Sequence, residues 1–162
     1  GKLAAGNMYT GNYLRTEGTN GVLNFGKQFT QRPTRLKGYF KYTSVEINKS
    51  NDEMKYLIGQ PDTCQIFIAL GDWSEPVEIR TKPSDRKLFD KNDPHIIAYA
   101  DMYSGKSVTE YTPFTLELEY RDTDRIPTYI VVVASASKYG DYFTGGDGSV
   151  LFLDDFTLEY DY

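Results

Sequence analysis

The sequence predicts an all-β protein, an antiparallel β-sandwich of the jelly-roll type. Nine short segments of alternating or wholly apolar character recur along the 162 residues, separated by clusters of Gly, Pro, Asn, Asp and Ser. Aromatic residues form 15% of the chain, mainly 14 Tyr and 9 Phe, and they favour strands because they pack well on a pleated surface. Helical periodicity is hard to find anywhere, which argues against a helical fold class.

The nine segments are expected as strands, in chain order, at residues 3–14, 21–29, 34–45, 62–73, 77–81, 96–103, 114–120, 128–137 and 149–160. Alternation is clearest where Phe114, Leu116, Leu118 and Tyr120 share one face, so this strand should have its other face in water. Residues 128–137 are apolar on both faces, as expected of a central strand that is covered twice.

Two longer stretches read as connections between these strands. Residues 48–62 carry one expected helical turn at residues 52–57, and residues 81–94 gather prolines and charges without a strand pattern. Neither resembles a linker, because the strands on both sides share one composition. Residues 1–162 are therefore predicted to form one domain, of a length that buries about two thirds of the surface of its unfolded chain.

Charge and composition exclude several classes of function. The formal net charge is -5, and without a basic patch the chain is not expected to bind nucleic acid. No apolar run is long enough to span a membrane. Cys64 is the single cysteine, which rules out an intrachain disulfide, and its apolar setting predicts a core thiol. His95, the single histidine, is interpreted as a strand-entry residue, and no G-x-S-x-G motif accompanies it.

The pair Asp154 and Asp155 interrupts the last apolar segment. Neighbours on a strand point to opposite faces, so the two carboxylates cannot form a catalytic pair with each other. Strict alternation places Asp154 among the apolar side chains Phe152, Phe156, Leu158 and Tyr160, where a carboxylate needs compensation. The compensation is either a cation, with calcium the natural choice, or a β-bulge that turns both carboxylates towards solvent or loop amides.

Aromatic residues supply the candidates for ligand contact. Alternation places Trp73 at the end of its strand beside Asp72, either as a cap on the rim of the core or as a surface on which a sugar ring stacks. Further tyrosines are candidates for the same face: Tyr39, Tyr42, Tyr99 and Tyr103. Tyr142 precedes a glycine-rich loop whose glycines are expected to supply positive φ angles, and it is either a plug or a contact residue.

Four stretches carry a resemblance to a known family: "PTRLKGYFKY", "CQIFIALGDWS", "DKNDPHIIAYA" and the segment 127–160, "PTYIVVVASASKYGDYFTGGDGSVLFLDDFTLEY". The chain resembles the putative carbohydrate metabolism domain found towards the C-terminus of surface proteins and lipoproteins of Bacteroidetes-type bacteria. The resemblance implies a jelly-roll β-sandwich, a location in the cell envelope, at the outer surface or in the periplasm, and a part in handling glycans.

The same resemblance bears on metal binding and assembly. The ending "GSVLFLDDFTLEY" is similar to the last strand of many carbohydrate-binding jelly rolls, whose first aspartate helps to hold a structural calcium ion, which points to Asp154. Family members usually carry several more strands before the segment that begins this chain. The resemblance therefore implies that the chain is part of a larger surface protein, and a missing edge strand favours a homodimer or strand exchange.

Together these observations predict a non-catalytic carbohydrate-binding or accessory module of an exported bacterial protein, with a glycan as its ligand and no required cofactor. Two alternatives stay open. One is a glycoside hydrolase or lyase that uses two carboxylates on the concave sheet, such as Glu117 and Asp101. The other is a structural domain for assembly at the cell surface, which would bury Trp73 and the tyrosines and present no concave aromatic face.

Overall fold

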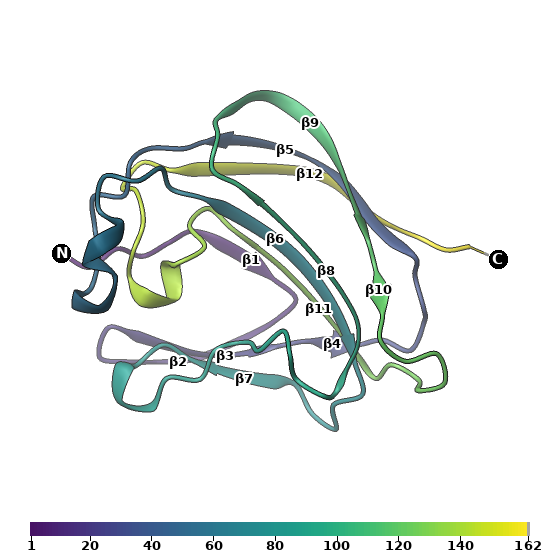
Figure 1. Cartoon of the computed structure of the whole chain (residues 1–162). Coiled ribbons are helices and arrows are strands. Elements are labelled where there is room, and N and C mark those ends of the chain that lie inside the picture. Colours follow the sequence, from purple (N-terminus) through teal and green to yellow (C-terminus); the bar gives the residue numbers. More distant parts are fainter. Residues whose placement is uncertain (162) are drawn as a thin grey trace.

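The structure is a computed structural model that describes residues 1–161. Within them the chain forms antiparallel sheets and three short 3₁₀ helices, η1 (Asp52–Leu57), η2 (Pro83–Asp85) and η3 (Gly140–Tyr142) (Figure 1). The predicted helical turn in the 48–62 connection is η1, where the Asn51 side chain accepts a hydrogen bond of 3.0 Å from the Met54 amide. No helix in this part of the chain is long and apolar enough to cross a membrane.

Residues 1–161 form three sheets. The central sheet has the order β1-β11-β6-β8-β10, and β4 also pairs with β11. Its strands are β1 (Asn7–Tyr9), β11 (Tyr129–Ser135), β6 (Cys64–Gly71), β8 (Ile96–Ser104), β10 (Glu119–Tyr120) and β4 (Lys27–Gln28). The outer sheet has the order β12-β5-β9, formed by Val150–Glu159, Arg35–Thr43 and Val108–Glu117. The lower sheet has the order β2-β3-β7, formed by Gly11–Glu17, Asn20–Phe25 and Val77–Arg80. The predicted antiparallel β-sandwich is confirmed, because the central and outer sheets pack face to face around a shared hydrophobic core.

Strand β11 occupies the middle of the molecule, as its composition predicted. Val132 packs into the core between the central and outer sheets, while Val131 and Val133 pack into the core on the opposite side. The same alternation divides β6, whose Ile66 and Ile68 face the outer sheet. Each such aliphatic side chain contributes about 1.5–3 kcal/mol when it is fully buried.

The core between the central and outer sheets, here called the inner core, is completed by the inward positions of β5 and β9. Leu116 and Leu118 point inward as the alternation predicted, and Glu117 lies exposed. Tyr42 is buried here at 1% exposure, and its hydroxyl donates to the carbonyl of Ala136 at 2.7 Å. The outward face of β9 is wet because the outer sheet is the last layer on this side.

A β-bulge in β12 corrects the predicted alternation of the last strand. The register against β5 shifts between Asp154 and Thr157, and Asp155 takes a positive φ of 55°. Asp154 therefore stays exposed, whereas Phe156 packs into the inner core beside Gly38. A Cβ at Gly38 would lie 2.7 Å from the Phe156 ring, so the absence of a side chain there makes room for the bulge.

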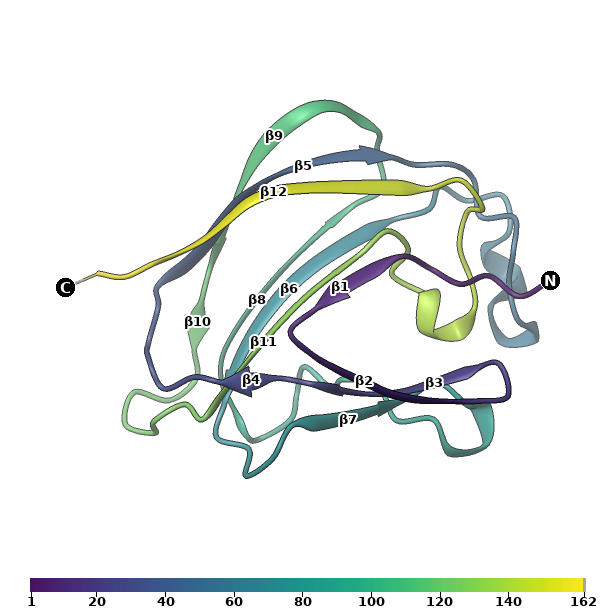
Figure 2. The ribbon, with the colours of Figure 1, turned by 180° about the vertical axis from the view of Figure 1, so that it is seen from behind.

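The lower sheet was not predicted from the sequence. It meets the central sheet at the end where β4 lies and splays away from it towards η3 and the chain start (Figures 1 and 2). At the closed end a second core, here called the wedge core, packs Phe25 and Ile79 of the lower sheet against Phe67 and Val131 of the central sheet. The two sheets thus form a wedge with one closed end and one open end.

Candidate functional site

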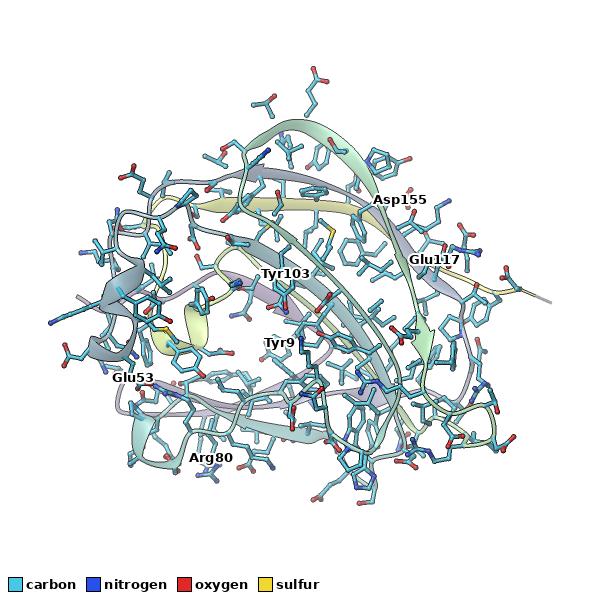
Figure 3. All side chains as sticks on the ribbon, viewed as in Figure 1. Tyr9, Glu53, Arg80, Tyr103, Glu117 and Asp155 are labelled. Carbon is cyan, nitrogen blue, oxygen red and sulfur yellow. The ribbon has the colours of Figure 1, made fainter. Side chains whose placement is uncertain are left out.

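A cleft of about 680 Å³ lies between the central and lower sheets, where the wedge opens. Its volume falls within the range of about 300–1,000 Å³ that is usual for small-molecule sites. Figure 3 shows Tyr103 on the side of the central sheet that faces this space. The cleft is lined by side chains from both sheets, from the 81–94 connection, from the first residues of the chain and from η3.

The central sheet provides the floor of the cleft. Strand periodicity brings Gln65 and Phe67 of β6, and Tyr99 and Tyr103 of β8, to the face opposite the inner core. Tyr103 is 46% exposed, and its hydroxyl accepts a hydrogen bond of 3.1 Å from the Gln65 amide. The floor therefore presents an accessible aromatic ring with a polar neighbour.

Tyr99 is held more firmly than Tyr103. Its hydroxyl donates to the Asp101 carboxylate at 3.1 Å, and its ring packs against Phe67 at 6.0 Å between centroids. Burial, with a further contribution from Asp101, raises the pKa of Tyr99 above its usual range. The hydroxyl thus remains a proton donor at neutral pH.

The 81–94 connection forms the opposite wall. Phe89 stacks on Phe67 with a centroid separation of 5.1 Å and an interplanar angle of 29°. Trp73 packs edge-on against the same Phe89 ring at 6.1 Å. The connection, which has no strand pattern, is thereby fixed by aromatic contacts across the wedge.

The rim of the open end is formed by η3. Tyr142 lines the cleft, and the Arg86 guanidinium lies over its ring at 4.3 Å. Asp141 also lines the cleft; its side chain is exposed to solvent, although nearby protein atoms partly desolvate the carboxyl. This desolvation raises the pKa of the Asp141 carboxyl, and the positive charge of Arg86 opposes the shift.

A buried carboxylate that sequence reasoning missed supports this rim. Asp62, 1% exposed, accepts hydrogen bonds from the Ser137 hydroxyl at 2.6 Å, the Gly146 amide at 2.8 Å and the Thr63 amide at 2.8 Å. It therefore joins the start of β6 to both chain segments that flank η3. No local pattern around residue 62 marks this role, because its partners lie 75 and 84 residues away.

The glycine-rich loop that follows η3 depends on close packing more than on backbone freedom. Only Gly148 of its three glycines has a positive φ, of 112°, so the expectation of positive φ fails for Gly145 and Gly146. A Cβ at Gly145 would lie 2.6 Å from the Ser137 hydroxyl oxygen, and one at Gly146 would contact Val45. The left-handed residue next to η3 is Phe143, at a φ of 53°.

The cleft brings together Tyr99, Tyr103 and Tyr142, three of the seven residues named as candidate carbohydrate contacts. Trp73 lies elsewhere: it is 7% exposed in the wedge core, and its indole N–H donates to Asp93 at 3.0 Å. The structure therefore gives Trp73 the role of a core cap rather than an accessible stacking surface. Tyr42, buried in the inner core, is equally inaccessible to a ligand.

Asp72 anchors a loop instead of facing the cleft. One carboxylate oxygen contacts His95 Nδ1 at 2.9 Å, and the other accepts from Arg125 at 3.1 Å. Partial burial acts to raise its pKa, but the hydrogen bonds from His95 and Arg125 outweigh this, so the pKa of Asp72 is lowered. The network ties the end of β6 to the loop that precedes β11.

Tyr39 and Asp154 lie on the outward side of the outer sheet, opposite each other in the β5–β12 register. Tyr39 is 42% exposed there, away from the cleft. Among residues 1–161 no group of three His, Cys, Asp or Glu side chains is placed to hold a metal ion. A calcium ion at Asp154 stays a prediction.

The two acids named for a hydrolase do not face each other across the cleft. Glu117, on β9, forms an ion pair of 3.0 Å with Arg35 of β5, so it belongs to the outer sheet (Figure 3). Asp101 lies on β8 of the central sheet with the Tyr99 hydroxyl. The cleft is lined instead by the carboxylates of Asp90 and Asp141.

Comparison with known proteins agrees with the fold. Residues 1–159 match the family described as "Putative carbohydrate metabolism domain". Two solved structures are similar, each described as a putative glycoside hydrolase: one from Bacteroides thetaiotaomicron VPI-5482, with a TM-score of 0.65, and one from Bacteroides vulgatus ATCC 8482, with a TM-score of 0.66. Both are 22% identical to the chain, so they show the fold alone.

The two structural matches cover 88% and 87% of this chain. The chain in turn spans 47% of the protein from B. thetaiotaomicron and 63% of the one from B. vulgatus. Both of these proteins are therefore longer than the chain. No curated protein matches the sequence significantly.

Proposed function

The chain belongs to the family of putative carbohydrate metabolism domains, and from this premise we propose that it is a non-catalytic carbohydrate-binding module. The observation that carries the proposal is the aromatic cleft, in which Tyr99, Tyr103 and Tyr142 meet in one concave site. A sugar ring stacks its C–H face on an aromatic ring while its hydroxyls bond to nearby polar groups. Cleft-lining amides supply such partners: Asn7, Asn20, Gln65 and Asn92.

The cleft also separates this proposal from an assembly role. The assembly hypothesis requires that Trp73 and the tyrosines are buried and that no concave aromatic face exists. Trp73 meets the first requirement, but Tyr103 is 46% exposed within a concave site. An accessible ring in a cleft favours ligand binding.

The test is affinity electrophoresis through native gels that contain a panel of plant and host polysaccharides. The variant Tyr103→Ala removes the exposed ring of the cleft, whereas Tyr39→Ala removes a tyrosine of similar exposure on the outer sheet. We expect at least one polysaccharide to retard the wild-type protein and the Tyr39 variant but not the Tyr103 variant. Unchanged retardation of the Tyr103 variant, or no retardation by any polysaccharide, would refute the proposal.

We further propose that the module works within a larger protein exported to the cell envelope. The greater length of both structural neighbours supports a multi-domain setting. The prediction that this protein is a lipoprotein is tested by metabolic labelling of the native protein with a fatty-acid probe. Absence of label, or recovery in the cytoplasmic fraction, would contradict it.

One observation favours a second function, glycoside hydrolysis. A general acid needs a raised pKa, and the Asp141 carboxyl has one inside a cleft that Asp90 also lines. The test is incubation of the protein with each retained polysaccharide, followed by an assay for new reducing ends. Release that Asp141→Asn abolishes would establish the hydrolase, whereas binding without release supports the binding module.

A further inference from the structure

A lysine in the cleft is held by aromatic rings instead of by acids. Lys138, in the turn between β11 and η3, lines the cleft, and its ammonium lies 4.8 Å from the ring centroids of both Tyr103 and Tyr139. Within residues 1–161, no carboxylate approaches the ammonium closely enough to form an ion pair with it.

The position of Lys138 is set by its surroundings. Its backbone amide donates to the Thr63 carbonyl at 2.8 Å, and the neighbouring Ser137 is held by Asp62. The Tyr103 ring lies under the ammonium, and its hydroxyl accepts a hydrogen bond from Gln65 at 3.1 Å. The positive charge is therefore placed over the same ring that the proposed function uses for stacking.

This arrangement leaves the charge of Lys138 available. A cation–π contact attracts an ammonium but does not neutralise it, whereas a carboxylate would. Other cations of the chain are already paired, among them Arg35, Lys37 and Arg125. The residues that line the cleft carry balanced formal charges, Lys91 and Lys138 against Asp90 and Asp141, while the Asp101 carboxylate lies by the Tyr99 and Tyr103 hydroxyls. An anionic group is therefore attracted to the Lys138 ammonium over the Tyr103 ring and not to the hydroxyl end of that ring.

We propose that the cleft binds an acidic glycan, whose carboxylate or sulfate group contacts the Lys138 ammonium while a sugar ring stacks on the part of the exposed Tyr103 ring that the ammonium leaves uncovered. This inference rests on the proposed carbohydrate-binding function and adds the chemical class of the ligand. A charge-assisted hydrogen bond from an ammonium to an anionic group is among the stronger polar contacts. Neutral glycans would lack it.

The outer sheet offers a matched control. Lys41 is also held over two rings, at 4.6 Å from Phe152 and 4.8 Å from Tyr111, and it lies outside the cleft. Lys138→Gln and Lys41→Gln change the net charge equally and remove the same kind of cation–π contact. Their mobilities in a native gel without polysaccharide are therefore directly comparable.

The experiment measures retardation of the wild type and both variants in gels that contain polygalacturonate, alginate, chondroitin sulfate, or neutral xylan and mannan. Polygalacturonate and alginate carry carboxylates only, while chondroitin sulfate also carries sulfate, so the arms distinguish the anionic groups. We expect an acidic polysaccharide to bind the wild type and Lys41→Gln about tenfold or more tightly than Lys138→Gln. Added salt should weaken this binding, because it screens the charges.

The results separate this inference from the proposed function. Retardation only by neutral polysaccharides, lost in Tyr103→Ala but kept in Lys138→Gln, would overturn the acidic ligand and leave the binding module intact. Retardation by an acidic polysaccharide that Lys138→Gln does not weaken would also overturn it. No retardation of the wild type in any gel would overturn both.

Discussion

The face of the central sheet towards the outer sheet is closed, whereas the face towards the lower sheet is closed only at one end. On β6, Ile66 and Ile68 are fully buried against the outer sheet. On the other face, Phe67 is buried in the wedge core, but Tyr103 of the neighbouring strand is 46% exposed. The same strands therefore line a packed core on one side and an accessible cleft on the other.

The difference separates stability from function. Strands β5, β9 and β12 lie across the central sheet and bury its apolar positions, which stabilises the fold. The lower sheet contacts the central sheet through the wedge core and then diverges, which leaves room for a ligand. Substitutions on the closed face should cost stability, and those on the open face should cost binding.

The largest expected effect is that of Ile68→Ala in the inner core. Ile68 is fully buried, so its truncation should lower the free energy of unfolding by about 2–5 kcal/mol, through lost burial and the cavity that remains. Chemical denaturation monitored by circular dichroism measures this. Tyr103→Ala, on the open face, should change stability by about 0.5 kcal/mol or less. Equal losses of unfolding free energy in the two variants would contradict the difference between the closed and the open face.

An intermediate effect is expected for Asp62→Ala, at the base of the open end. The variant leaves three donors without their acceptor, from Ser137, Gly146 and Thr63, and should lower the free energy of unfolding by about 1–3 kcal/mol. It should also weaken retardation by the glycan that the wild type binds, because the rim of the cleft loses its support. Chemical denaturation measures the loss of stability, and affinity electrophoresis of the same purified variant measures the loss of retardation.

Asp147→Ala is the control for this prediction. Asp147 lies in the same glycine-rich loop but is exposed, so its truncation should change stability by about 0.5 kcal/mol or less. If the Asp62 and Asp147 variants were equally stable, the buried network would not support the rim.

The smallest expected effect concerns pH. The pKa of Asp141 is raised in the folded protein, so the folded state holds its proton to higher pH than the unfolded chain does. The stability that this carboxyl contributes is fully present below its unfolded pKa of about 3.8 and is lost as pH rises through the folded pKa. Asp141→Asn should therefore be more stable than the wild type at pH 7.

The gain in stability from Asp141→Asn should shrink as pH falls and vanish below about pH 3.8. Thermal unfolding of both proteins across this pH range measures it. A variant that is less stable than the wild type at pH 7 would contradict the desolvated setting of Asp141. Asp90→Asn, at an exposed position that also lines the cleft, is the matched control.

Much of the strand layout could be predicted from the sequence, because burial in a sheet leaves a period-two pattern. The double burial of β11 and the wet face of residues 114–117 in β9 were predicted in this way. The lower sheet was missed because most of β2 is exposed, so its pattern says nothing about where the sheet lies. The bulge in β12 was left open because it depends on Gly38, more than a hundred residues away.

The candidate site was predicted only in part. Tyr99, Tyr103 and Tyr142 line the cleft as proposed. Tyr39 and Tyr42, however, had been grouped on one face although residues three apart on a strand point to opposite faces. The spacing of these two tyrosines in the sequence was therefore enough to separate them. Trp73 is covered by Phe89, which comes from a connection without any regular pattern, so its burial depends on tertiary packing alone.

The most direct test of the central claim is an amide ¹H–¹⁵N NMR titration of the domain with an oligosaccharide of the glycan that retards it most strongly. The account predicts that shift changes concentrate at cleft residues such as Gln65, Tyr103 and Lys138. Tyr39 and Tyr111 on the outer sheet should stay unchanged. Changes confined to the outer sheet or to the surroundings of Asp72, or no changes with any glycan, would contradict the account.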